Sequence, residues 1–204
     1  MRLKGPAAGL LILAAAPAAG HEFTAGADVY AGFVEGVAVP LSWPPALVCL
    51  IAFGILAGLW RNVGPGRPLA ALVLGGACGI GLSGLQLPAS ALAPHVVGLC
   101  VAALAASGLS PSKPLDAAAG FLTGAAAIAG TLDGHPLGAI PLSVYVGICF
   151  GAGVLAVATT ALAMMSFDRW GEAKWLSITW RTVASWCAAI LLLALAFEFR
   201  PIPV

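Results

Sequence analysis

The residues of this 204-residue sequence that best suit a transition-metal site are His21, Glu22, His95, Asp133 and His135. Imidazole and carboxylate groups bind nickel, cobalt, copper and zinc ions. If a mature chain begins at His21, its free α-amine and its imidazole form a chelate from one residue. Glu22 could add an oxygen, and Asp133 with His135 could approach from another loop. The pattern predicts an external mouth that gathers divalent cations; the alternative is that these are solvated loop residues.

His95 differs from the other four because it stands inside an apolar stretch, directly after Pro94. An ionisable group within a membrane span is a candidate for function. The alternative is a neutral imidazole that is hydrogen-bonded to a backbone carbonyl on the preceding helical turn.

The five cysteines each lie in a different apolar stretch, and none forms a CxxC pair. Converging thiolates would favour a soft ion such as Cu(I). Cysteine is also a small apolar residue that packs well, and we interpret these five as packing residues.

The composition around these residues is that of a membrane protein. Hydrophobic residues make up 61% of the chain and charged residues only 8%, whereas about a quarter of a soluble domain is charged. Nine Lys and Arg nearly balance eight Asp and Glu, which leaves no basic field for nucleic acid. The motifs of hydrolases, nucleotide-binding proteins and zinc proteases are missing from the sequence, so we expect no enzyme. The expected partner is the lipid bilayer, with a homo-oligomer or a larger membrane complex left open.

The first twenty residues resemble a targeting sequence. Arg2 and Lys4 precede a short apolar stretch centred on residues 10–13, and small residues follow at 18–20. This pattern predicts a signal peptide at 1–20 that is cleaved to release His21. Cleavage before Ala19 and an uncleaved signal anchor are the alternatives.

Six apolar stretches follow, separated by segments rich in Pro, Gly and charge. They predict an all-α fold, a polytopic membrane bundle of six transmembrane helices after the signal peptide. The predicted helices are 41–60, 68–87, 88–109, 115–132, 140–165 and 178–199, between an external segment at 21–40 and an external tail at 200–204. The longest break, 167–175, has mixed charges and two Trp, which suits the lipid headgroup level. Trp43 and Trp60 are expected to anchor the two ends of the first helix there.

The Lys and Arg residues orient this bundle. With the mature N-terminus outside, six of them fall on the inner side and only Arg200 on the outer side. Because basic loops stay in the cytoplasm, both mature termini are predicted to be periplasmic, in a multi-pass protein of a bacterial inner membrane.

Four glycine pairs with four-residue spacing predict close contacts between helices, since small residues let backbones approach in lipid. They are Gly54/Gly58, Gly75/Gly79, Gly120/Gly124 and Gly147/Gly151.

Architecture and short sequence matches together resemble the HupE/UreJ family of hydrogenase and urease accessory permeases. Residues 31–33 (AGF) and 39–42 (VPLS) resemble the opening of that family's first helix, 87–88 (LP) the start of its third, and 181–189 (RTVASWCAA) its last. The resemblance implies a permease for a divalent transition metal, nickel or cobalt, with copper and zinc left open by the ligand types. The ion would be the transported species and not a permanently bound cofactor.

The chain departs from that family at its metal ligands. In the family the first helix carries His-Pro followed by an Asp-His pair, but here Val39, Pro45 and Ala46 stand at the first His, the Asp and the second His. The His-rich fourth helix is matched by FLTGAAAIA between Gly120 and Gly130. Apolar side chains cannot replace the water ligands of a metal ion. The alternative function is therefore that of a ligand-depleted relative, a structural or assembly subunit of a larger membrane complex.

We expect the purified mature protein to begin at His21, which intact-mass measurement would show. An Ala added in front of His21 should weaken metal binding, because the free amine then belongs to another residue. Metal titration of the two forms tests this. A chain that starts at Ala19 or Met1 would contradict the chelate, and equal affinities would leave the cleavage point right and the metal site wrong.

Overall fold

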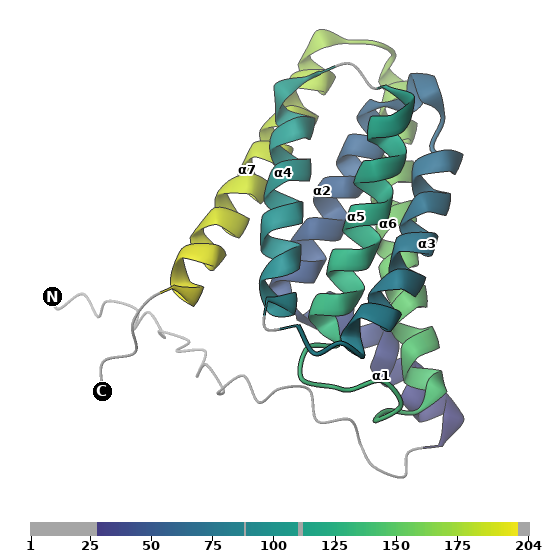
Figure 1. Ribbon diagram of the computed structural model, residues 1–204. Helices are drawn as coiled ribbons and strands as arrows, with labels where there is room; N and C mark the ends of the chain where they lie inside the picture. Colours follow the sequence, from purple (N-terminus) through teal and green to yellow (C-terminus); the bar gives the residue numbers. More distant parts are fainter. Residues whose placement is uncertain (1–27, 88, 110–111, 200–204) are drawn as a thin grey trace, which may run out of the picture.

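All regular structure is helical in the part of the chain that the computed structural model describes, residues 28–87, 89–109 and 112–199. This agrees with the all-α fold expected from the sequence. The long helices lie side by side as a bundle (Figure 1). The elements are α1 (Val29–Ser42), α2 (Pro44–Leu59), η1 (Arg61–Val63), α3 (Gly66–Ser83), η2 (Ser90–Leu92), α4 (Ala93–Ser107), α5 (Lys113–Thr131), α6 (Leu142–Trp170) and α7 (Lys174–Glu198).

Four helical segments are long and apolar enough to cross a membrane: α3, α6, α7, and α4 together with η2. Helices α1 and α2 pass the same test as one broken span, bent by 77°, which raises the number to five. Helix α5 lies outside this set because it consists largely of Ala and Gly and carries Lys113 and Asp116 in its first turn. The described chain thus has the composition of a multi-pass membrane protein.

The direction of the helices places the basic residues near one end of the bundle. Helices α2, α4 and α6 run one way and α3, α5 and α7 the other (Figure 1). We call the end with the α2–α3, α4–α5 and α6–α7 connections the basic end. Within the described ranges, every Lys and Arg lies in these connections or in the helices near them: Arg61, Arg67, Lys113, Arg169, Lys174 and Arg181. The opposite end holds Asp28, Asp133 and Glu198.

Glycines bring the helix backbones into direct contact, as their spacing predicted. A Cβ atom at Gly75 would overlap the backbone carbonyl of Phe121, and one at Gly124 would overlap the carbonyl of Leu72, so α3 and α5 touch without side chains between them. Gly147 and Gly151 do the same between α6 and α1, whereas Gly54 and Gly58 of α2 lie closest to the side chains of Thr159 and Ala163 on α6. Such contacts supply the packing that lipid does not drive.

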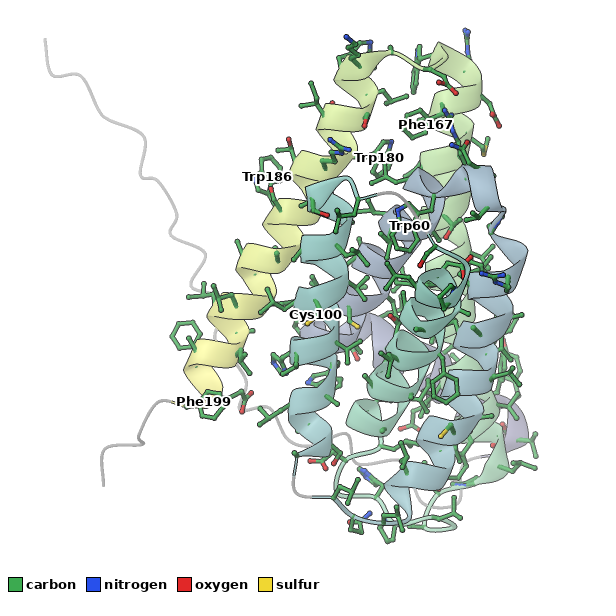
Figure 2. The ribbon with its side chains drawn as sticks, turned by 45° about the horizontal axis from the view of Figure 1, so that its top comes forward. Trp60, Cys100, Phe167, Trp180, Trp186 and Phe199 are labelled. Carbon is green, nitrogen blue, oxygen red and sulfur yellow. The ribbon has the colours of Figure 1, made fainter. Side chains whose placement is uncertain are left out.

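Helix α2 is the centre of the bundle. It contacts α1, α4, α5, α6 and α7, and its large side chains, among them Leu50 and Phe53, are fully buried. Trp60, at its end, is also buried, and its indole N–H donates to the carbonyl of Leu109 (3.0 Å). Figure 2 shows Trp60 among the helices and Trp186 on the outer side of α7. The expectation that Trp60 anchors the first helix at the membrane surface is therefore wrong.

Helical structure begins earlier than the sequence suggested. The segment expected to precede the first helix, 21–40, contains most of α1. Asp28 caps this helix, because its Oδ1 accepts from the Ala31 N–H (2.7 Å), and Gly36 packs against the backbone of Val144 on α6. Pro40 lies within the helix without ending it, although proline removes one backbone donor.

The expected long break at 167–175 is also wrong. Helix α6 continues to Trp170, and only residues 171–173 separate it from α7. The Arg61 guanidinium lies over the Phe167 ring, 4.3 Å from its centroid, and forms an ion pair with Glu172 (2.6 Å). Arg169 lies in the last turn of α6, and Glu172 pairs with Arg61 from the short connection.

Replacing Gly75 with Ala should destabilise the bundle by about 1–3 kcal/mol, the usual cost of overpacking, because the new methyl meets the α5 backbone. Gly81→Ala on the same helix is the matched control, since nothing lies within 4 Å of a Cβ there. Thermal unfolding in detergent should show a lower Tm for Gly75→Ala alone. Equal Tm values would contradict the backbone contact.

Candidate functional site

The predicted external mouth is described in part. His21 and Glu22 lie outside the described residues. Asp133 and His135 are held in the α5–α6 connection, where Asp133 accepts a hydrogen bond from the Ser90 hydroxyl of η2 and the His135 Nδ1–H donates to the Asp133 carbonyl (3.1 Å). The structure therefore brings Asp133 and His135 together at the end opposite the basic end.

No group of three or more His, Cys, Asp or Glu side chains with the geometry of a metal site occurs in the described ranges. Asp133, His135 and His95 therefore do not form a closed site by themselves, and the mouth that includes His21 stays a prediction. All five cysteines are described and free. They belong to no group of three or more candidate ligands in the described ranges, and Cys49 packs against Gly98 as a small apolar residue would.

His95 is buried near the start of α4, with only 2% of its surface exposed. Its Nδ1 lies 3.1 Å from the Ala91 carbonyl oxygen one turn earlier, which confirms the expected hydrogen bond. Since a carbonyl only accepts, Nδ1 carries the proton. The other ring nitrogen, Nε2, takes no part in this hydrogen bond and is a common metal-binding atom.

Trp43 packs beside His95 at the bend between α1 and α2. Its ring meets the imidazole edge-on, with 6.4 Å between the centroids, and it is partly buried against the core. Gly130 of α5 leaves room for Trp43 and Pro94, whose nearest atoms would stand 2.8–2.9 Å from a Cβ there. Broken helices at membrane depth are tolerated where they border a cavity or are covered by protein. We call Trp43, Pro94, His95 and Gly130 the His95 cluster.

Asp116 is a buried acid that the sequence analysis did not single out. Its side chain is 1% exposed, and its Oδ1 accepts from the Arg67 guanidinium, from Nε at 3.1 Å and also from Nη2. Its Oδ2 has no hydrogen-bond partner. A buried carboxylate oxygen without a donor is rare in folded proteins and calls for an explanation.

Thr123 is the second unpartnered polar group, fully buried in the middle of α5. Threonines in apolar helices usually donate to a carbonyl on the preceding turn. Thr131, Thr159 and Thr160 do so, at 2.8–2.9 Å. The hydroxyl of Thr123 does not and is left in the core without a partner.

Asp116 and Thr123 lie on one face of α5, and that face leads to the His95 cluster. Asp116, Thr123 and Gly130 recur every seven residues, so they share one face of α5, with about 10 Å between successive positions. Gly130 meets the His95 cluster, so these groups extend from Arg67 at the basic end to His95 near the opposite end. We call Asp116, Thr123 and His95 the polar line. The sequence pattern that could have indicated the polar line is an acid and a hydroxyl seven residues apart, Asp116 and Thr123, in one apolar stretch.

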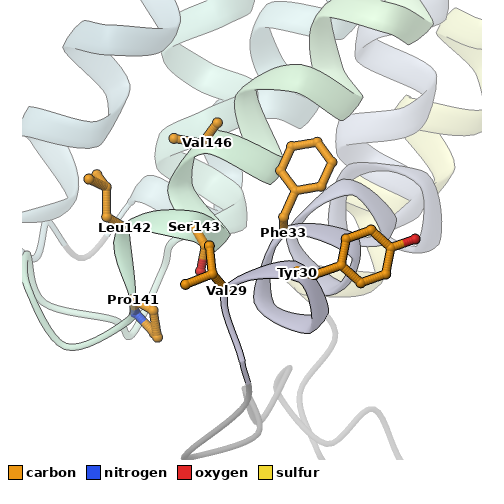
Figure 3. Close-up of a pocket in the computed structure, with 7 residues that line it drawn as sticks. All are labelled: Val29, Tyr30, Phe33, Pro141, Leu142, Ser143 and Val146. Carbon is orange, nitrogen blue, oxygen red and sulfur yellow. The ribbon is translucent and has the colours of Figure 1, made fainter.

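Figure 3 shows an apolar cavity, an open groove of about 740 Å³ between the starts of α1 and α6. Its lining includes Tyr30 and Phe33 from α1 and Leu142 and Val146 from α6. It presents no set of groups for acid–base or nucleophilic chemistry, so we place the candidate site on the polar line.

Comparison with protein-family models, with curated proteins and with solved structures gives no match for this chain. Its function is therefore argued from its own residues. The features that carry the argument are the membrane composition, the basic end and the polar line.

Proposed function

We propose that the chain is a membrane permease for a divalent transition metal ion, nickel or cobalt by its resemblance to the HupE/UreJ family. In this proposal the broken pair α1–α2 and helices α3 to α7 form six spans. Helix α5 is the sixth, although it is the least apolar, because α2, α3 and α4 cover it and it needs less contact with lipid. The glycines and alanines of α5 pack against these neighbouring helices.

The observation that supports transport is the polar line. A buried donor or acceptor without a partner costs about 1–3 kcal/mol, and ionisable residues inside membrane proteins mark ion pathways. Asp116 and Thr123 each leave an oxygen unpartnered, and Nε2 of His95 takes no part in the hydrogen bond to Ala91. An ion that moves along this line would meet a nitrogen, a hydroxyl and a carboxylate in turn.

The ligand types narrow the class of ion. Imidazole nitrogen together with carboxylate oxygen suits nickel, cobalt and zinc better than a soft ion that prefers thiolate. Single protein ligands spaced about 10 Å apart hold an ion weakly, so it would keep most of its water ligands. The mouth of His21, Glu22, Asp133 and His135 would then raise the local cation concentration.

The absence of a three-ligand cluster from the described residues favours a second function, an assembly subunit of a larger membrane complex. A subunit of this kind needs the bundle but not the polar line. The two functions differ in whether the chain moves metal.

We further propose that the basic end faces the cytoplasm of a bacterial inner membrane, since Lys and Arg are retained on that side. Both mature termini would then be periplasmic. Gly66→Cys at the basic end and Ala139→Cys at the opposite end change exposed residues. In intact spheroplasts an impermeant maleimide should label Ala139→Cys only, above the background of the native cysteines. Labelling of Gly66→Cys alone would reverse the orientation.

Cells that produce the wild-type chain should accumulate nickel or cobalt faster than control cells. His95→Leu should lower that uptake by about tenfold or more, the order of loss expected on damage to a metal's ligand environment. Cys100→Ala, an exposed position on the same helix, should leave uptake unchanged. Uptake of nickel, cobalt, copper and zinc is measured at matched amounts of membrane protein. No gain for any of the four ions would favour the assembly subunit.

A further inference from the structure

The ion pair between Arg67 and Asp116 uses only half of the carboxylate. Both hydrogen bonds that Arg67 donates to Asp116 go to Oδ1, and Oδ2 has no hydrogen-bond partner. Since a carboxylate can accept a guanidinium on both oxygens, this geometry leaves room for a second cationic partner at Oδ2.

The two partners differ in their exposure to solvent. Asp116 is 1% exposed and lies in the first turn of α5, where Gly120 and Gly124 press that helix against the backbone of α3 at Pro68 and Leu72. Arg67 lies at the start of α3 with 45% of its side chain exposed. The carboxylate is therefore enclosed by protein, whereas almost half of the Arg67 side chain lies at the surface of the basic end.

Electrostatics makes a divalent cation compete with the Arg67 guanidinium for Asp116. A buried carboxylate without a counterion is strongly unfavourable, so Asp116 needs a positive partner. A divalent cation at Oδ2 would supply that charge and would repel the Arg67 guanidinium. If Arg67 left, its departure would free Oδ1 for the same cation. The basic end of the polar line would then be open.

We propose that Asp116 is a cation-binding residue at the basic end of the path and that Arg67 is its displaceable counterion. The pair closes the path when no ion is present, and a divalent cation opens it by taking the place of the guanidinium. Thr123, about 10 Å further along α5, is the preceding oxygen ligand. This proposal rests on the permease function and adds the residues that bind and release the ion at the basic end.

A purely structural ion pair predicts different behaviour. Neutralising both members of such a pair is often harmless, and a metal ion would have no effect that depends on Asp116. The variants Asp116→Asn, Arg67→Gln and the double variant separate the two roles, because Asn keeps the shape of the side chain and removes its charge.

The first measurement is the Tm of the purified full chain in detergent, with and without NiCl2. Nickel should raise the Tm of the wild type. The increase should be larger for Arg67→Gln, because nickel replaces the missing counterion in that variant. The increase should be smallest for Asp116→Asn. The double variant should respond like Asp116→Asn. Equal nickel shifts in all four chains would overturn the proposal.

The second measurement is Ni2+ flux into proteoliposomes that contain the same chains. The flux through Asp116→Asn should be at least about tenfold lower than that through the wild type. Thr123→Val should lower the flux without lowering the Tm, since this change removes an unpartnered hydroxyl. Thr160→Val is the control, because that hydroxyl is already bonded to its own helix at Ala156. Wild-type flux that survives in Asp116→Asn would overturn the proposal and leave the permease function standing.

The two measurements also separate the failures. An Asp116-dependent nickel shift without any flux would support the cation site and contradict the permease function. A wild-type chain with neither shift nor flux would overturn both.

Discussion

Direct contact between helix backbones is the constraint on which the rest of this structure depends. Lipid tails are as apolar as the side chains that would leave them, so helices in a membrane gain little from apolar burial and associate through close packing. Here Gly75 and Gly124 place the α3 and α5 backbones against each other, and Gly147 does the same for α1 and α6. The registers of these contacts fix which residues of each helix face the interior.

The polar line is a consequence of that register. The contacts of Gly120 and Gly124 with α3 hold the adjoining face of α5, with Asp116 and Thr123, inside the bundle. Two unpartnered oxygens in a protein interior oppose folding, and the close contacts around them offset this cost. The glycine contacts stabilise the bundle enough for polar groups to stay in its interior. An ion path through a bundle needs polar groups in that position.

The proposed relation to the HupE/UreJ permeases would require metal ligands other than the histidines of that family. Val39, Pro45 and Ala46, at the positions where the resemblance would place those ligands, are all buried and serve as packing around the α1–α2 bend. The remaining His95 lies beside the same bend, against Trp43. If the chain carries a metal ion, it does so with one imidazole and one carboxylate on α4 and α5 in place of a histidine cluster.

The sequence by itself determined the features that depend on composition and short spacing. These are the membrane environment, the helical class, the glycine contacts, the shared end of the basic residues and the backbone hydrogen bond of His95. Only the tertiary structure decided what depends on neighbours far along the chain. Trp43 and Trp60 have the sequence context of interface anchors, yet Trp43 packs against His95 and Trp60 is buried. Helix α1 packs against α6 through Gly36. Asp116 reads as an ordinary first-turn acid, and its importance comes from Arg67, 49 residues away, because burial and pairing are properties of the packed bundle and not of a local pattern.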